Sequence, residues 1–124
     1  MKKFAIVLAV IFIAVFSGCT VGSGTALMMQ ETNTASRMSA EYKKFSGYKK
    51  TTVKLSQDEE KEVSVSIVTE KGKIDLEIVH EDGEVAYEGN DLETTDFTVT
   101  LNKSGKYTVR VDTKKHVGSY DINW

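Results

Sequence analysis

Acidic side chains gather in two short segments of the chain, and carboxylates are the side chains that bind calcium best. Asp58 and Glu60 lie in the first segment, and Asp82 and Glu84 lie in the second. Because calcium takes about six to eight oxygen ligands, two such loops at one end of a domain could share an ion. No EF-hand spacing is present, and an acidic rim that stays hydrated is the alternative, which we favour.

A second candidate segment interleaves aromatic residues with lysines. Tyr42, Phe45 and Tyr48 are followed or preceded by lysine pairs at 43–44 and 49–50. Such a strip could stack on sugar rings, or hold an anionic wall polymer or lipid headgroups. It also suits a first strand at a sheet edge, where lysines discourage pairing with another chain. We favour the edge strand and keep the three aromatic residues as candidate ligand contacts.

No catalytic set is recognisable in the sequence. His80 and His116, the two histidines, fall in segments that we expect at opposite ends of the domain, so they cannot share a metal ion or an acid–base step. A Gly-x-Ser-x-Gly motif is missing. The single cysteine excludes an internal disulfide and a zinc site with several thiolates. We therefore predict a protein that is not an enzyme and uses no cofactor.

The first 19 residues have the pattern of an export signal. Lys2 and Lys3 precede an apolar run over residues 4–16, which as a helix would span about 20 Å of a roughly 30 Å hydrocarbon core. FSGC at 16–19 resembles the lipobox of bacterial lipoproteins, with Phe16 where Leu is usual. The resemblance implies a signal peptide over 1–18, acyl chains such as palmitate on Cys19, and anchoring on the extracytoplasmic face of the cell membrane. The alternative is an ordinary signal peptide with an incidental cysteine.

The rest of the chain divides into a polar segment and a strand-forming segment. Residues 19–40 are rich in Ser and Thr, which predicts a flexible tether after Cys19. Beyond residue 50, apolar and polar residues alternate in seven segments, at 53–55, 63–67, 74–78, 85–87, 97–101, 107–111 and 120–124. This alternation predicts an all-β domain over 41–124, an antiparallel β-sandwich of about seven strands with Greek-key or jelly-roll-like connections.

Turn residues suggest how these strands pair. Asp82-Gly83 predicts a two-residue hairpin turn with Ile78 opposite Tyr87 and His80 opposite Val85. The segment 102–105, NKSG, predicts a second hairpin with Leu101 opposite Tyr107 and Val99 opposite Val109. Residues 35–45 have helical spacing, and the alternative there is one irregular strand over 42–55.

Composition limits the class of protein. The 124 residues allow one domain, and 40% of them are hydrophobic, too many for a wholly disordered chain. With 16 basic and 18 acidic side chains, the charge balance argues against a nucleic-acid partner.

Five turn-and-strand motifs carry a resemblance that covers about residues 45–124. They are FSGY (45–48), KGKIDLEIV (71–79), EDGEV (81–85), SGKYTV (104–109) and GSYDINW (118–124). They resemble small bacterial surface lipoproteins whose β-sandwich is similar to pre-peptidase C-terminal domains. The resemblance implies a non-catalytic extracellular accessory module, with calcium or sugar as ligands in some members. Two hypotheses follow: a membrane-anchored binding module for a glycan or another ligand, or an accessory or inhibitor subunit that docks on another envelope protein.

Overall fold

The computed structural model describes residues 20–124, which form an all-β domain. Its strands are β1 (Val21–Leu27), β2 (Gln30–Thr34), β3 (Arg37–Leu55), β4 (Lys61–His80), β5 (Val85–Gly89), β6 (Thr95–Leu101) and β7 (Gly105–Asn123). All neighbouring strands are antiparallel. Among residues 20–124 there is no helix long and apolar enough to cross a membrane. The predicted fold class is confirmed.

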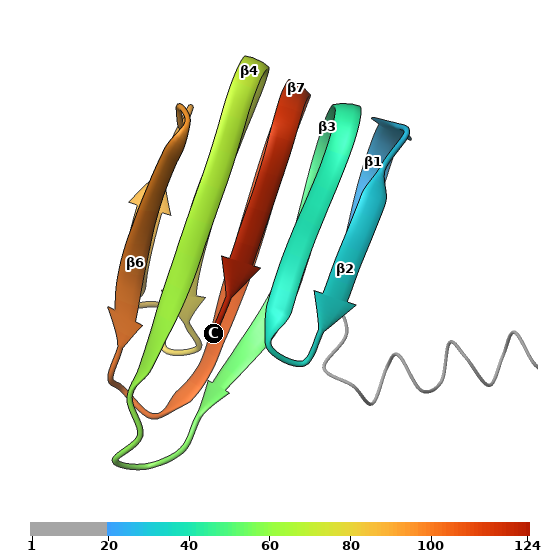
Figure 1. Cartoon of the computed structure of the whole chain (residues 1–124). Coiled ribbons are helices and arrows are strands. Elements are labelled where there is room, and N and C mark those ends of the chain that lie inside the picture. The colour runs from blue at the N-terminus through green and yellow to red at the C-terminus, as the bar shows by residue number, and fades with distance from the viewer. Residues whose placement is uncertain (1–19) are drawn as a thin grey trace, which may run out of the picture.

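Three long strands bend in the middle and fold one hydrogen-bonded sheet over onto itself. β3, β4 and β7 have 19, 20 and 19 residues, and Figure 1 shows each of them running up one layer and down the other. The front layer of Figure 1 contains β2, residues 37–42 of β3, residues 117–123 of β7, residues 61–69 of β4, and β6. The back layer contains β1, residues 47–55 of β3, residues 105–113 of β7, residues 73–80 of β4, and β5.

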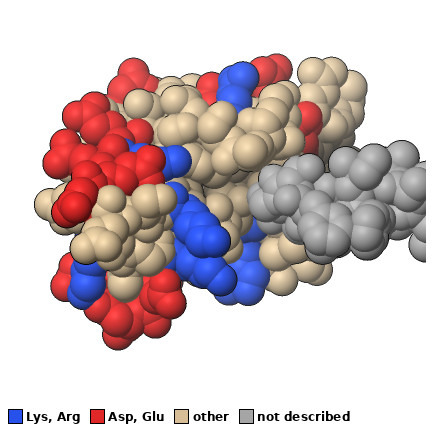
Figure 2. All heavy atoms as spheres, turned by 90° about the horizontal axis from the view of Figure 1, so that it is seen from below, with Lys and Arg blue, Asp and Glu red and all other residues tan. Residues whose placement is uncertain are grey.

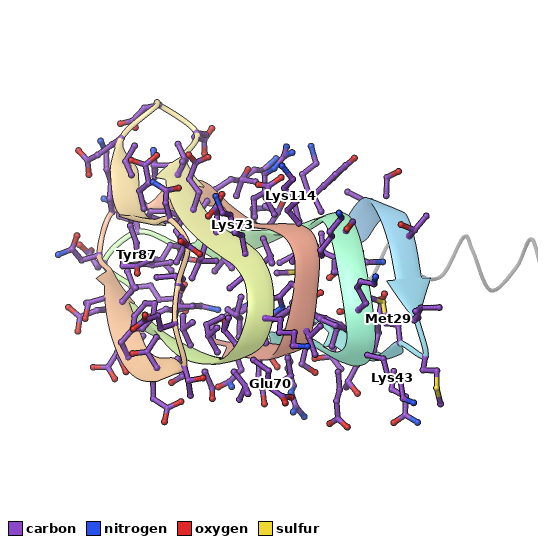
Figure 3. All side chains as sticks on the ribbon, turned by 90° about the horizontal axis from the view of Figure 1, so that it is seen from above. Met29, Lys43, Glu70, Lys73, Tyr87 and Lys114 are labelled. Atoms are coloured by element: carbon purple, nitrogen blue, oxygen red, sulfur yellow. The ribbon has the colours of Figure 1, made fainter. Side chains whose placement is uncertain are left out.

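Glycines and β-bulges make these bends possible. The pairing of β4 with β7 shifts register twice between Thr69 and Lys73, which is where the ribbons turn over in Figure 3. At Gly118, where φ is +149°, a Cβ atom would lie 1.9 Å from the carbonyl oxygen of Val68. At Gly72, with φ of +76°, it would lie 2.0 Å from the carbonyl oxygen of Lys115. Only glycine allows the two backbones to approach so closely.

The hydrophobic core lies between the two layers. Along β4, the inward residues of the first half are Val63, Val65 and Ile67, and those of the second half are Ile74, Leu76 and Ile78. All six are at most 2% exposed. The inward positions are odd-numbered before the bend and even-numbered after it, so the period-two pattern shifts by one residue where the register of β4 against β7 also shifts.

The predicted flexible tether over residues 19–40 is wrong for the part that the structure describes. Residues 21–34 form β1 and β2, which pair with β3 from Val21 opposite Lys50 to Thr34 opposite Arg37. Their side chains are exposed and mostly polar, so composition alone resembles a linker. The backbone hydrogen bonds to β3 hold them in the sheet, and the domain therefore begins before the expected boundary at residue 41.

Residues 35–45 contain no helix, because β3 runs unbroken from Arg37 to Leu55. The alternative of one irregular first strand is confirmed and extended, with bulges between Tyr42 and Gly47. The strand count of seven agrees with the prediction, but the membership differs. Segments 63–67 and 74–78 lie in the two halves of β4, and segment 107–111 and residues 120–123 lie in the two halves of β7.

Of the two predicted hairpins, one forms. Ile78 lies opposite Tyr87 as expected, and a bulge then places Val79, rather than His80, opposite Val85. The second hairpin is wrong, since β6 pairs with β4 in the front layer while the following half of β7 lies in the back layer. Residues 102–105 do form a turn, as predicted, but this turn connects the two layers. A turn of this kind can have the same local sequence as a hairpin turn.

Candidate functional site

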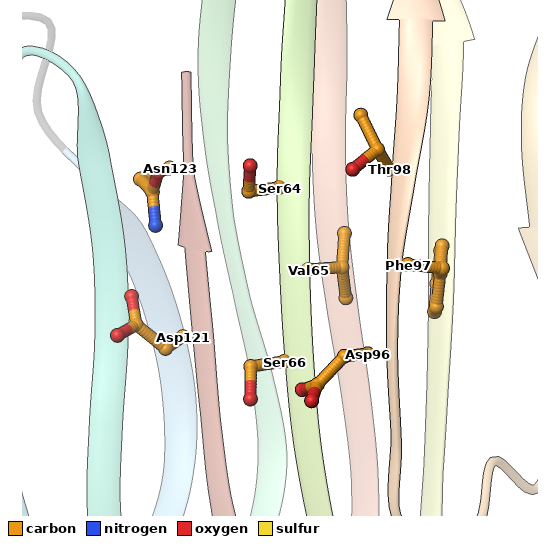
Figure 4. A pocket seen from close by; sticks show the side chains of 8 residues that line it. All are labelled: Ser64, Val65, Ser66, Asp96, Phe97, Thr98, Asp121 and Asn123. Carbon is orange, nitrogen blue, oxygen red and sulfur yellow. The ribbon is translucent and has the colours of Figure 1, made fainter.

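Two adjoining hollows lie on the outer face of the front layer. The first has a volume of about 380 Å³ and is lined by Ser64, Val65, Ser66, Asp96, Phe97, Thr98, Asp121 and Asn123 (Figure 4). The second has a volume of about 330 Å³ and is lined by Gln30, Thr32, Arg37, Ser39, Ala40, Glu41, Ser66, Ser119, Tyr120 and Asp121. Because the two share Ser66 and Asp121, they form one open groove across β6, β4, β7, β3 and β2, which we call the front groove.

Small residues on the central strands create the front groove. Ser66 of β4 lies opposite Asp96 of β6 on one side and Asp121 of β7 on the other. One rung further along the same face, Ser64 lies between Thr98 and Asn123. Short serine side chains in the middle and longer side chains to either side leave a depression whose floor is the sheet itself.

The polar groups of the front groove are partly fixed and partly free. Arg37 holds the Asp121 carboxylate through two hydrogen bonds, from Nε to Oδ1 at 3.0 Å and from Nη2 to Oδ2 at 2.8 Å. Asp96 is exposed, makes no side-chain hydrogen bond or ion pair with any residue from 20 to 124, and points toward Ser66 (Figure 4). The groove thus presents oriented acceptors next to hydroxyl groups that both donate and accept.

Aromatic surface is scarce in the front groove. Phe97 and Tyr120 are the aromatic residues that line it. Tyr120 is 2% exposed, and Phe97 packs against Tyr87 with ring centroids 4.8 Å apart. A ligand in the groove would therefore bind through hydrogen bonds much more than through stacking.

The outer face of the back layer carries long charged side chains that pair with one another. Arg110 donates to both carboxylate oxygens of Asp112, at 2.9 Å and 3.0 Å, and its guanidinium lies 4.5 Å from the ring centre of Tyr48. A hollow of about 240 Å³ beside them is lined by Asp75, Glu77 and Glu88 among others. Asp75 also accepts a hydrogen bond from the amide of Asp91, whereas Glu77 and Glu88 make no side-chain hydrogen bond or ion pair among residues 20–124. The charges of this face are mixed.

The structure does not bring the carboxylates of the two acidic loops together, and calcium binding there stays an untested prediction. Asp82 binds Lys103 and approaches Nδ1 of His80 at 3.0 Å, and Glu84 lies 3.8 Å from Lys103. The hydrogen bond from Lys103, above all, holds the pKa of Asp82 well below its usual range. Asp58 and Glu60 are exposed in their own turn, and within 20–124 no three His, Cys, Asp or Glu side chains are grouped to hold a metal ion. Figure 2 shows this end of the molecule, with acidic side chains on separate parts of the surface.

Two of the three aromatic ligand candidates are core residues. Tyr42 is 6% exposed and Phe45 is 2% exposed, so neither can stack on a ligand. Tyr48 faces outward, but Arg110 covers its ring. The alternation of the strand begins earlier than the sequence suggested, and it places Tyr42 and Phe45 inside.

The histidines occupy opposite ends of the domain, as expected, and His116 lies within β7. His116 is fully buried, with Nδ1 2.5 Å from the Tyr42 hydroxyl and Nε2 2.9 Å from Thr69 Oγ1. Since Thr69 Oγ1 donates to the carbonyl of Leu92, it accepts from Nε2, and the imidazole is neutral with Nδ1 as acceptor. Burial lowers the pKa of His116.

His80 is in the opposite electrostatic situation at the loop end. Its side chain is 6% exposed, and Nε2 donates to the carbonyl of Ser104 at 2.8 Å. This hydrogen bond, followed by the interaction with Asp82, raises the pKa of His80.

Cys19 and the predicted signal peptide lie outside the described residues, so lipid attachment stays a prediction. The sequence alone did not predict the residues of the front groove. One signal was present: the outward positions of β4 are serines at 64 and 66 but charged residues at 73, 75 and 77. The strands that flank these serines could not be known from the sequence.

Comparison with known proteins shows which solved structures have a similar fold. No protein-family model and no curated protein sequence matches the chain. The structure of TmCBM61 in complex with β-1,4-galactotriose matches with a TM-score of 0.51 and 17% identity, over 84% of this chain and 83% of that one. A carbohydrate-binding module of Cellvibrio mixtus lichenase 5A in complex with cellotriose matches with a TM-score of 0.43 and 13% identity, over 87% and 94%. The match to TmCBM61 shows a shared β-sandwich fold.

Proposed function

We propose that this protein is a non-catalytic glycan-binding module, anchored at the extracytoplasmic face of a bacterial membrane by acyl chains on Cys19. The observation that carries the glycan part is the front groove. Its serine and threonine hydroxyls, the carboxylates of Asp96 and Asp121 and the amide of Asn123 all open to solvent on one face. Sugar hydroxyls pair with such groups, because each can donate and accept a hydrogen bond.

The shape of the front groove favours an oligosaccharide over a single sugar. The groove crosses five neighbouring strands. With about 4.8 Å between strands, five strands span about 19 Å, which suits an extended chain of sugar units. The fold shared with TmCBM61, whose structure contains a galactotriose, supports the same ligand class.

Affinity should be modest. Aromatic rings give large contact areas at small entropic cost, and this groove exposes almost none. Hydrogen bonds to sugar replace hydrogen bonds to water, so each adds little net free energy. We expect a Kd on the order of 1 mM, equivalent to about −4 kcal/mol.

The anchor part of the proposal depends on the lipobox resemblance at FSGC, residues 16–19. Each buried CH₂ of an acyl chain contributes about 0.8 kcal/mol, and two or more chains make membrane attachment stable. Radiolabelled palmitate incorporation tests this part. The label should enter the wild-type protein and should be lost in Cys19→Ser.

The glycan part is tested by filling the groove. Ser66→Lys places a long side chain between Asp96 and Asp121, whereas Thr108→Lys adds the same side chain on the outer face of the back layer. Titration with a panel of oligosaccharides should find one that binds the wild type and Thr108→Lys equally. Binding to Ser66→Lys should be at least about tenfold weaker, a loss of about 1.4 kcal/mol. Equal affinity of the two variants for that oligosaccharide, or no binding across the panel, would contradict the proposal.

A further inference from the structure

β1 is an edge strand without charge, and it exposes apolar side chains. All seven of its residues are exposed. The sequence from Thr20 to Gln30 contains no charged residue. Five large hydrophobic residues are exposed among residues 20–124, and three of them are Val21 at 46%, Leu27 at 57% and Met28 at 73%.

The other edge strands of the sandwich look different. β2 carries Glu31, β5 carries Glu88 and β6 carries Asp96. Charged side chains on an edge strand keep it in water and prevent pairing with another chain. An uncharged edge strand with exposed apolar side chains at its end is instead suited to contact with another protein or with a membrane.

Lysines surround the apolar tip between β1 and β2. Lys44 lies opposite Leu27 in the sheet, and the exposed Lys43 precedes it on β3. Lys115 of the bend lines a hollow of about 280 Å³ together with Leu27 and Lys44. Figure 3 shows Lys43 and Met29 on the β1–β2 side of the molecule. An apolar tip framed by lysines complements an anionic lipid surface, which offers hydrocarbon below a layer of phosphates.

The position of β1 in the chain also supports contact with a lipid surface. Cys19 is two residues before Val21, and two residues span at most about 7 Å. A flexible tether of about twenty residues would have reached roughly 25 Å and allowed any orientation of the domain. Because residues 21–34 are paired into the sheet, an acylated Cys19 would hold the start of β1 at the lipid surface.

We propose that the domain rests on anionic lipid on its β1 edge, with Leu27 and Met28 among the headgroups and Lys43, Lys44 and Lys115 at the lipid phosphates. This proposal rests on the proposed anchor at Cys19. It sets the orientation of the front groove, which runs from β2 beside the membrane to β6 on the far side. A glycan in the groove would then extend away from the membrane.

Depth-dependent fluorescence quenching tests the proposal on the full, acylated protein. The protein is reconstituted in vesicles of phosphatidylcholine and phosphatidylglycerol in equal parts. Acylation blocks Cys19, so Met28→Cys and, as a matched control, Asp58→Cys at the exposed loop end each offer one free thiol for an environment-sensitive fluorophore. Nitroxide lipids labelled near the headgroup should quench the label at 28 at least about threefold more than the label at 58. Lys43→Gln with Lys44→Gln should reduce the quenching at 28.

The possible outcomes test three proposals separately: the lipid contact of β1, the acyl anchor at Cys19 and the glycan site. If the protein floats with the vesicles and quenching is equally weak at both positions, the proposed contact of β1 with lipid is wrong. The proposed anchor at Cys19 would not be affected by this result. Protein that does not float would overturn the anchor and, with it, the orientation. A blue-shifted label at 28 that lipid nitroxides do not quench, and that stays shifted in detergent, would show that a second copy covers β1, and it would overturn the proposal. Oligosaccharide titration of the same samples reports on the groove independently.

Discussion

The two outer faces of the sandwich are made by halves of the same three strands, yet they differ in shape and chemistry. In β4, the outward residues at the centre of the front half are Ser64 and Ser66, whereas those of the back half include Asp75 and Glu77. The front face is hollow because its central side chains are short. The fold provides two similar layers of one sheet, and side-chain length at a few central positions decides which of them is hollowed.

The two faces also differ in how their charges are used. On the back face, Arg110 is bound to Asp112 and stacked on Tyr48. On the front face, Arg37 orients Asp121, and Asp96 is left without a partner among residues 20–124. The front face therefore presents the Asp96 carboxylate beside its serines, whereas the arginine of the back face is held by Asp112 and Tyr48.

The largest expected effect comes from breaking the bends that set the two faces back to back. Gly118→Ala should lower the free energy of unfolding by at least about 3 kcal/mol, because the new Cβ would lie 1.9 Å from the Val68 carbonyl oxygen. Gly83→Ala is the matched control, with φ of +98° but no atom within 4 Å, and it should cost about 1–2 kcal/mol of backbone strain. Urea unfolding measures both. Similar losses in the two variants would show that the bends tolerate a side chain.

A smaller effect is expected from the buried hydrogen bonds beneath the faces. Tyr42→Phe removes the hydroxyl that donates to Nδ1 of the fully buried His116, which should cost about 1–3 kcal/mol. Tyr48→Phe removes a hydroxyl from an outward-facing ring and should change the free energy of unfolding by no more than about 0.5 kcal/mol. Urea unfolding of the pair distinguishes core from surface. The expectation fails if the two substitutions cost the same.

The arginines test whether the two faces differ in function rather than in stability. Arg37→Ala and Arg110→Ala each remove one partly exposed ion pair, and each should cost less than about 1 kcal/mol of stability. Arg37→Ala also frees Asp121 in the groove, so oligosaccharide affinity should fall by about threefold to tenfold, equivalent to about 1 kcal/mol. Calorimetric titration of both variants measures the difference. A loss of affinity in Arg110→Ala alone would assign binding to the back face.

The smallest effect concerns the histidines, which lie away from both faces. Burial lowers the pKa of His116, and the hydrogen bond to Ser104 raises that of His80. Stability contributed by neutral His116 is present above a pH of about 6.5 and is lost as the pH falls toward its folded pKa. Stability contributed by His80 is present below about 6.5 and is lost as the pH rises through its folded pKa.

Proton NMR of the two imidazole rings should therefore show one titration on each side of about pH 6.5. Oligosaccharide affinity should not follow either of them between pH 6 and pH 8, a range of about two units around neutrality. Two coincident titrations would contradict the assigned environments. A change of affinity with one of these titrations would mean that a histidine acts on the groove.

The sequence predicts the β class well because inward residues such as Val63 and Ile78 alternate with polar ones whatever the topology. The same alternation hides the bends: Gly72 looks like a hairpin turn, but β4 continues through it. The turn at 102–105 looks like a hairpin because nothing local shows that β6 pairs with β4 instead of β7.

The groove could not be predicted for a related reason. Ser66, Asp96 and Asp121 are far apart in sequence, and only the pairing of β4 with β6 and β7 brings them onto one rung. Likewise, residues 21–34 have the composition of a linker, and they form strands because they pair with β3. Local chemistry determined which side chains face inward, and long-range pairing determined which outward side chains meet.

Amide NMR of the ¹⁵N-labelled protein, titrated with an oligosaccharide that binds it, tests the central claim most directly. If the front groove is the binding site, the amides that shift will lie around Ser64, Ser66, Asp96 and Asp121, on one face of the sandwich. The amides of Glu77 and Arg110, on the opposite face, should stay unchanged. Shifts centred on the back face or on the acidic loops, with the front groove unchanged, would contradict the account.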